Sequence, residues 1–95
     1  MKIQRPLDSQ GRTGLAEIHP DGRATQLEGD LLSGVHSTDR PADIAKILAP
    51  IEPGVVLCSG MNYRKHAEEL GAKPPERPVL FIKTASCVQN PGDPI

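Results

Sequence analysis

The sequence has few of the residues that usually anchor a small hydrophobic core. Among its 95 residues there is no tryptophan, one tyrosine and one phenylalanine. Burial must therefore come from leucine, isoleucine and valine, because the bulky aromatic side chains are nearly missing. With 37% hydrophobic residues, a chain of this length buries only a modest fraction of its surface. We expect the free energy of unfolding to be small.

The charges and the apolar runs exclude two classes of partner. Eleven basic and twelve acidic residues leave a formal net charge of −1, which provides no basic surface for nucleic acid or for an anionic membrane. No stretch approaches the roughly 20 apolar residues that span a bilayer. The N-terminus also has no apolar signal segment. We expect a cytoplasmic protein that binds neither nucleic acid nor membrane.

Only two cysteines are present, Cys58 and Cys87. They have neither a CxxC spacing nor a Cys/His metal spacing, so neither a zinc site nor a disulfide framework is indicated. We expect two free thiols in the core.

Proline and glycine, by contrast, are plentiful. Ten prolines and nine glycines indicate many turns and short elements. In the first half, "GLAEIHP" and "RATQLEG" flank the turn sequence "PDG" at 20–22, which predicts a β-hairpin. Residues 41–49 predict a helix, with Thr38 or Asp39 as N-cap and Pro41 in the first turn. Its apolar stripe has helical spacing: Ile44, Ile47 and Leu48.

The second half begins with a run rich in β-branched residues. Residues 55–59 predict a buried strand, and the segment "VLFIK" predicts another. Between them, residues 62–70 predict a short helix with Asn62 as N-cap, and Gly71 occupies the C-terminal position that favours a left-handed backbone. The turn "NPGDPI" comes last, and we expect the chain to continue beyond Ile95.

His66 and Glu69 form a candidate catalytic pair on this helix. Residues three apart lie on one helical face, so the carboxylate can fix the tautomer of the imidazole and favour its charged form. That arrangement makes a histidine into a general base. On spacing alone, an ordinary exposed ion pair is the simpler interpretation. His19 and His36 are expected to be surface residues without partners.

The stretch "GMNYRKHAEELG", followed by "RPVLFIKTASCVQNPGDPI", resembles the fumarylacetoacetate hydrolase family. The shared region of that family begins with Gly-x-Asn-Tyr-x-x-His-Ala-x-Glu and continues to Pro-x-x-Phe-x-Lys and Gly-Asp-Pro-Ile. The resemblance is close over residues 55–95, and "GRTGLAEIHPDGRATQLEGD" is similar to the small N-terminal β-domain of many bacterial members. It covers nearly all of this chain but less than half of a usual member. Thr84 departs from the usual proline of the family, and Asn90 from its usual glycine.

The resemblance implies an enzyme that hydrolyses a C–C bond in a 2-oxo or β-diketo carboxylic acid, of acylpyruvate or fumarylacetoacetate type, as in aromatic catabolism. It implies His66 as general base, Glu69 as the residue that orients it, and Lys83 as a positive charge toward substrate or enolate. Tyr63 and Asn62 would shape and cap a lid helix, and Tyr63 is a further candidate for substrate binding. For Lys83, the alternative is a strand lysine whose stem covers apolar surface.

The resemblance also implies a divalent cation, Mg²⁺ or Mn²⁺, held by a Glu-x-Glu segment and a later aspartate. None of these ligands can be assigned here, because Glu68 and Glu69 are adjacent on the lid and Asp93 lies in a turn. We expect the ligands to lie outside this chain. The chain alone is then expected to be inactive, and the full-length enzyme to be a homodimer.

The predicted fold class is α+β. Residues 1–50 are expected to form a small N-terminal β-rich domain with the helix at 41–49. Residues 51–95 are expected to begin the fumarylacetoacetase-like mixed β catalytic domain, which is truncated. Hydratase, isomerase, decarboxylase or lyase chemistry of the same family stays open, as does a non-catalytic domain that keeps the scaffold.

Overall fold

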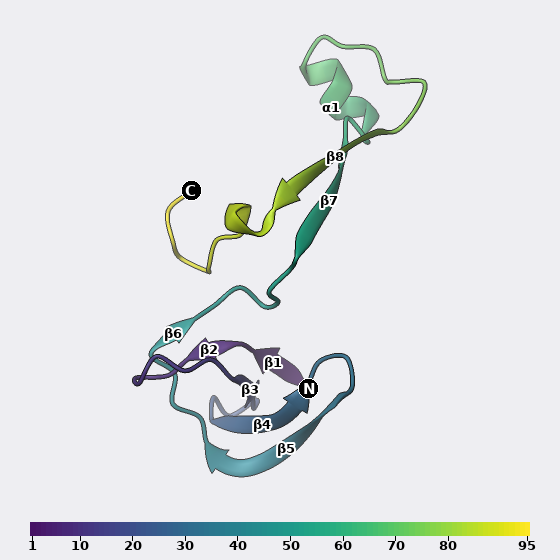
Figure 1. Cartoon of the computed structure of the whole chain (residues 1–95). Coiled ribbons are helices and arrows are strands. Elements are labelled where there is room, and N and C mark those ends of the chain that lie inside the picture. Colours follow the sequence, from purple (N-terminus) through teal and green to yellow (C-terminus); the bar gives the residue numbers. More distant parts are fainter. The chain divides into compact units, whose positions relative to one another are not determined.

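The computed structural model describes residues 1–95 and consists mostly of short antiparallel strands (Figure 1). Contacts within the chain define two compact units. The first unit contains Met1–Ile51 together with Gln89–Ile95, and the second unit contains Glu52–Val88. The α-helix has six residues. No helix of the structure has the length and apolar character needed to cross a membrane.

Four strands form the main sheet of the first unit, in the order β1-β3-β4-β5, with antiparallel neighbours. Their bounds are Lys2–Gln4 (β1), Leu15–Ile18 (β3), Ala24–Asp30 (β4) and Gly34–Pro41 (β5). The buried residues of this unit are few: Pro6, Ala16, Thr25, Leu27 and Ala49. No large side chain is completely buried, so the core is as thin as the composition predicts.

The predicted hairpin is confirmed by the pairing of β3 with β4, in register from Leu15–Leu27 to Ile18–Ala24. In the turn, the His19 amide donates to the Arg23 carbonyl and the Gly22 amide donates to the His19 carbonyl, both at 2.9 Å. Gly22 has a φ of 88°, which glycine adopts without steric cost. The expectation that His19 has no partner is wrong, because its Nε2 lies 2.8 Å from Thr25 Oγ1.

The predicted helix at 41–49 is wrong. Pro41 is the last residue of β5, and Lys46–Ile47 form strand β6, which pairs antiparallel with β2, Pro6–Leu7. Amides of this segment donate to distant carbonyl groups instead of to the preceding turn: Ala42 to Ala24, Ala45 to Leu7 and Leu48 to Arg5. Long-range strand pairing therefore overrides the local apolar stripe, as tertiary context often overrides helix propensity.

The segment Gln89–Ile95 packs against β6 in the first unit. Lys46 Nζ lies 2.8 Å from a carboxylate oxygen of Asp93, and the Ala49 amide donates to Asn90 Oδ1 at 2.9 Å. The hydrogen bond from Lys46, followed by one from Asn90, lowers the pKa of Asp93. The predicted domains, 1–50 and 51–95, stay a prediction.

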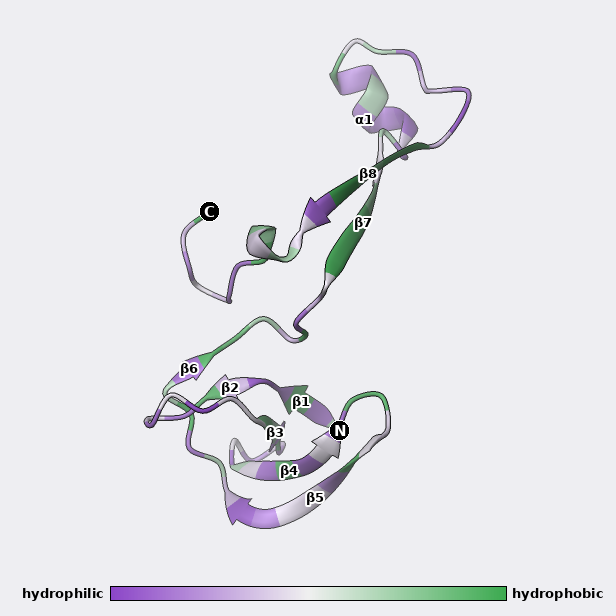
Figure 2. Cartoon of the chain, in the orientation of Figure 1, coloured by the Kyte–Doolittle hydropathy of each residue, from purple (hydrophilic) through white to green (hydrophobic).

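In the second unit, β7 (Val55–Gly60) and β8 (Val79–Thr84) form a two-stranded antiparallel ribbon. Its apolar residues appear as green ribbon in Figure 2. The predicted strands are present, but the predicted burial of the first is wrong, since Leu57 is 69% exposed. All of β8 is exposed as well. An isolated two-stranded ribbon has no second layer to cover its faces and is marginally stable.

Both cysteines are free, as expected, but they do not both lie in a core. Cys58 is half-buried on β7, whereas Cys87 is exposed at the end of a short 3₁₀ turn, Ala85–Cys87. The expectation of a buried thiol is therefore wrong for Cys87, because this turn has no buried residue.

Candidate active site

Helix α1 (Arg64–Glu69) carries the predicted catalytic pair. Its N-cap is Tyr63, in an extended conformation without a side-chain capping hydrogen bond, so the prediction of Asn62 as N-cap is wrong. Met61, the residue that follows β7, has a φ of 47°. This left-handed conformation is rare for a bulky residue and typically costs about 1–3 kcal/mol. The turn that leads from the ribbon into α1 is therefore strained.

The C-terminal end of α1 follows the prediction from Gly71, which has a φ of 65°. The Gly71 amide donates to the Glu68 carbonyl at 3.0 Å, and the Ala72 amide donates to the Ala67 carbonyl at 2.9 Å. These two hydrogen bonds form a Schellman C-cap. Ala67 is also the one buried residue of the helix, so the cap and this small contact hold α1 in place.

The structure brings His66 and Glu69 together. His66 Nδ1 and Glu69 Oε2 lie 3.9 Å apart, which is too long for a hydrogen bond of about 3 Å but close enough for an ion pair with a protonated ring. The side chains are 55% and 77% exposed, respectively. Their attraction in this chain is therefore weakened by water. The catalytic roles of the two residues stay predictions.

Lys83 is not brought to this pair. It lies opposite Val56 in the ribbon, whereas α1 follows the other end, where Gly60 pairs with Val79. Four residues at about 3.4 Å each separate the two ends by about 14 Å. Tyr63 is 76% exposed. The predicted substrate contacts of Lys83 and Tyr63 stay predictions.

The chain does not contain a complete cation site. No group of three histidine, cysteine, aspartate or glutamate side chains is arranged to hold a metal ion anywhere in residues 1–95. Mg²⁺ requires near-octahedral coordination by oxygen. The residues of this chain therefore do not fit a complete Mg²⁺ or Mn²⁺ site by themselves.

A depression of about 320 Å³ lies beside the start of α1. It is lined by the strand-to-helix turn and by the proline-rich loop that follows the helix: Gly60, Met61, Asn62, Arg64, Pro74, Pro75, Glu76, Arg77 and Pro78. His66 and Glu69 are not among these residues. The second unit thus presents both a candidate proton-transfer pair and a hollow beside the same helix.

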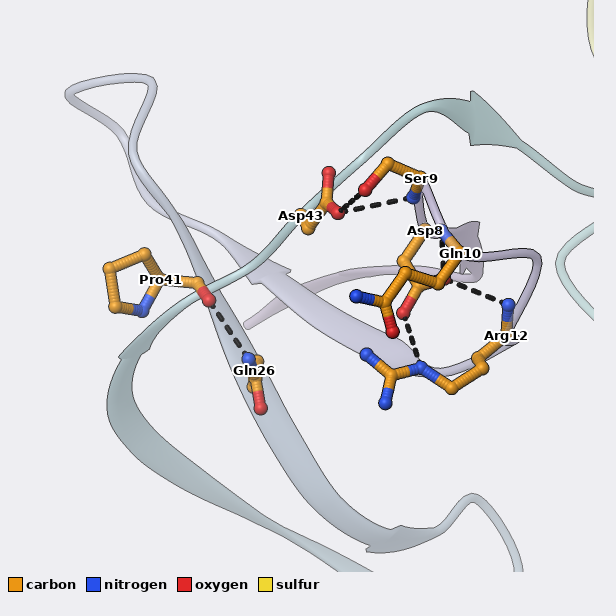
Figure 3. Close-up of polar contacts among 7 residues, drawn as sticks. All are labelled: Asp8, Ser9, Gln10, Arg12, Gln26, Pro41 and Asp43. Carbon is orange, nitrogen blue, oxygen red and sulfur yellow. Dashed lines mark hydrogen bonds and ion pairs between the residues drawn. The ribbon is translucent and has the colours of Figure 1, made fainter.

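Another depression, of about 330 Å³, lies in the first unit, and charged groups at its edge bind one another (Figure 3). Arg12 Nε lies 2.8 Å from Asp8 Oδ2, and the Ser9 amide donates to Asp43 Oδ2 at 3.1 Å. Hydrogen bonds from the Arg12 amide and side chain lower the pKa of Asp8. Sequence reasoning missed this cluster, whose signal is the turn-forming "DSQGR" segment. These contacts fix the conformation of the loop that contains this segment.

No family model matches the chain, but individual proteins do. It is 35% identical over 66 residues to "Fumarylacetoacetate hydrolase domain-containing protein 2 homolog" of Dictyostelium discoideum, covering 70% of this chain and 22% of that protein. It is 44% identical over 50 residues to "Oxaloacetate tautomerase fahd2, mitochondrial" of Xenopus laevis, covering 52% of this chain and 16% of that protein.

A solved structure of an uncharacterized protein of Mycobacterium abscessus is similar to the chain with a TM-score of 0.63 and 32% identity. The similarity covers 90% of this chain and 34% of that protein. The small antiparallel sheets with little helix are thus compatible with part of a larger fold. The chain is a homologue of fumarylacetoacetate hydrolase domain-containing proteins, which confirms the resemblance of its motifs. It spans about a fifth of the length of the two curated relatives described.

Proposed function

We propose that this chain provides the lid helix and the proton-transfer pair of an enzyme that acts on a 2-oxo carboxylic acid, in a protein that includes the rest of the family fold. One observation carries the proposal: an imidazole and a carboxylate lie 3.9 Å apart on a short, exposed helix. The helix has one buried residue, Ala67, so few contacts hold it. Active-site lids are drawn from such weakly held segments.

In this arrangement His66 accepts a proton through Nε2, because Nδ1 faces Glu69 Oε2. A small rotation of either side chain shortens the distance to that of a hydrogen bond, in which Nδ1–H donates to the carboxylate. The carboxylate then fixes the tautomer and stabilises the charged ring that forms. Closure of the lid over substrate removes water and strengthens this attraction.

Two reactions use this proton transfer. In keto–enol tautomerisation, the base removes a proton from the carbon beside the keto group, the C–H electrons form the enol double bond, and the keto oxygen gains a proton. In C–C hydrolysis, the base takes a proton from water, whose oxygen adds to a carbonyl carbon. The adjacent C–C bond then breaks, its electrons leave as the enolate of the second product, and that enolate takes the proton from the imidazolium. The tautomerase relatives favour the first reaction, on a 2-oxo dicarboxylic acid. Hydrolysis, which the motifs of the family imply, is the second candidate.

The rest of the site is proposed for the whole protein. Lys83 supplies positive charge to the developing enolate when the full fold places substrate near that end of the ribbon. A Mg²⁺ or Mn²⁺ ion would polarise the keto oxygen from ligands outside this chain. The full-length protein is proposed to be a homodimer.

The test uses the full-length protein with two substrates. Conversion of enol to keto oxaloacetate and cleavage of an acylpyruvate are each followed by the loss of ultraviolet absorbance. We expect turnover of at least one substrate, with kcat reduced by His66→Ala and, less strongly, by Glu69→Gln. Because the two residues act as one unit, the double variant is expected to be little worse than His66→Ala alone. Losses that multiply would show that the residues act separately, and the absence of turnover of both substrates would overturn the proposal.

A further inference from the structure

Arginine side chains are used differently in the two units. Three arginines of the first unit form ion pairs: Arg12 with Asp8, Arg23 with Asp21 and Arg40 with Glu28. The fourth, Arg5, donates to the Ala49 carbonyl at 3.4 Å. The remaining two arginines of the chain, Arg64 and Arg77, have neither an ion-pair nor a hydrogen-bond partner for their side chains.

These two arginines line the same depression of about 320 Å³ beside α1. Glu76 is the one carboxylate in its lining, and it forms no ion pair with either guanidinium group. Two guanidinium groups and one carboxylate leave one net positive charge. Three prolines also line the hollow, and their fixed φ angles stiffen the loop that carries Arg77. The hollow is therefore a positively charged concavity with unused hydrogen-bond donors.

Guanidinium groups recognise carboxylates through paired N–H donors, and such charge-assisted hydrogen bonds are stronger than neutral ones. We propose that Arg64 and Arg77 bind the carboxylate of the substrate that is remote from the reacting keto group. This inference rests on the proposed function and narrows it, because the site selects 2-oxo dicarboxylates over 2-oxo monocarboxylates. Asn62, in the same lining, adds an amide donor.

The kinetic test compares oxaloacetate with pyruvate in the full-length protein. Arg64→Gln and Arg77→Gln are each expected to raise KM for the dicarboxylate about tenfold or more, with a small change in kcat, because the lost contact binds ground and transition states alike. Kinetic parameters for the monocarboxylate are expected to change little. Lys65→Gln, which removes a neighbouring charge outside the lining, serves as control. An unchanged KM for oxaloacetate, or equal losses for both substrates, would overturn the inference.

A binding measurement separates this inference from the proposed function. Succinate, which cannot react, is titrated against full-length protein and followed by calorimetry, with acetate for comparison. We expect both arginine variants to weaken succinate binding and Glu76→Gln to strengthen it, because that change removes the opposing charge. If the protein shows no turnover but its arginine variants lose succinate binding, the proposed reaction is rejected and the carboxylate site is kept. Normal succinate binding in those variants of an active enzyme would reject the carboxylate site alone.

Discussion

The two units of this protein differ in how their charged side chains are paired and how their apolar side chains are buried. In the first unit, charged groups pair with one another, and a small core forms around Leu27 on a four-stranded sheet. In the second unit, the apolar faces of β7 and β8 are exposed, and one residue, Ala67, is buried. The unpaired arginines and the His66–Glu69 pair lie there as well. The first unit thus pairs most of its arginines with carboxylates, whereas the second leaves Arg64 and Arg77 without an ion-pair partner.

The contrast is sharpest for catalysis. In the full-length protein, His66→Ala is expected to lower kcat about 10²- to 10⁴-fold, which is the usual loss for a positioned general base. KM should change far less, because a base acts mainly in the transition state. The matched control is His36→Ala, since His36 is an exposed histidine on β5 of the first unit. Steady-state kinetics of both variants measures the two values of kcat. An equal fall in kcat in the two variants would contradict the assignment of the general base to the second unit.

A leucine in each unit tests the difference in packing. Leu27→Ala is expected to reduce the free energy of unfolding by about 2–3 kcal/mol, because it leaves a cavity in a thin core. Leu57→Ala removes a side chain that is 69% exposed and should change that free energy by less than about 0.5 kcal/mol. Denaturant unfolding of the 95-residue chain measures both. A large effect of Leu57→Ala would mean that the ribbon is covered in solution.

Changing the C-cap of α1 is expected to have a smaller effect on stability than Leu27→Ala. Gly71→Ala places a β-carbon at a φ of 65° and should destabilise the helix by about 1 kcal/mol. Hydrogen exchange at the Leu70 and Ala72 amides should then be about fivefold faster, since these amides close the last turn. Gly54→Ala is the control, because a β-carbon there meets no atom within 4 Å and its φ is not positive. Unchanged exchange in Gly71→Ala would indicate that α1 is already open.

The smallest expected effect concerns Asp93 in the first unit. The hydrogen bond from Lys46 is the main cause of its lowered pKa, so Lys46→Met should raise that pKa toward the ordinary value of 3.8. A lowered pKa means that the pair stabilises the fold above that ordinary value and that this stabilisation is lost as pH falls through the lowered pKa. The variant should therefore lose stability at neutral pH but little in strong acid.

Titration of the Asp93 carboxyl by nuclear magnetic resonance measures this shift. Lys73→Met, which removes an exposed lysine of the second unit, is the control and should leave the Asp93 pKa unchanged. An unshifted pKa in Lys46→Met would mean that the pair does not form in solution.

Local patterns predicted the parts of the fold that depend on neighbouring residues. The β3–β4 hairpin follows from turn chemistry, and the Gly71 cap follows from the need for a left-handed residue. The mistaken helix at 41–49 shows where such patterns fail, because β6 exists through pairing with β2, about 40 residues earlier. Strand β5 was also missed, since "GVHSTDRP" lacks apolar alternation. Its pairing with β4 needs glycine at Gly29, where a β-carbon would clash with the Gly34 carbonyl oxygen.

The candidate site was predictable to the same extent. The closeness of His66 and Glu69 follows from helical spacing alone, and the structure places them 3.9 Å apart. The separation of Lys83 from this pair depends on strand register, which no local pattern specifies. The free state of Arg64 and Arg77 depends on which carboxylates lie nearby in space. Their role therefore became visible only from the folded chain.

The hydrogen bond between Ala49 and Asn90 has a consequence for how this protein can change in evolution. It joins the two points where the chain leaves the first unit and returns to it. The second unit is therefore an insertion whose two ends are held close together. Closing a longer loop between fixed ends costs only about 0.6 kcal/mol for each doubling of its length. Residues can therefore be added to or removed from the insertion while the register of the first sheet is kept. A change in the length of the second unit is therefore expected to cost the first unit little stability.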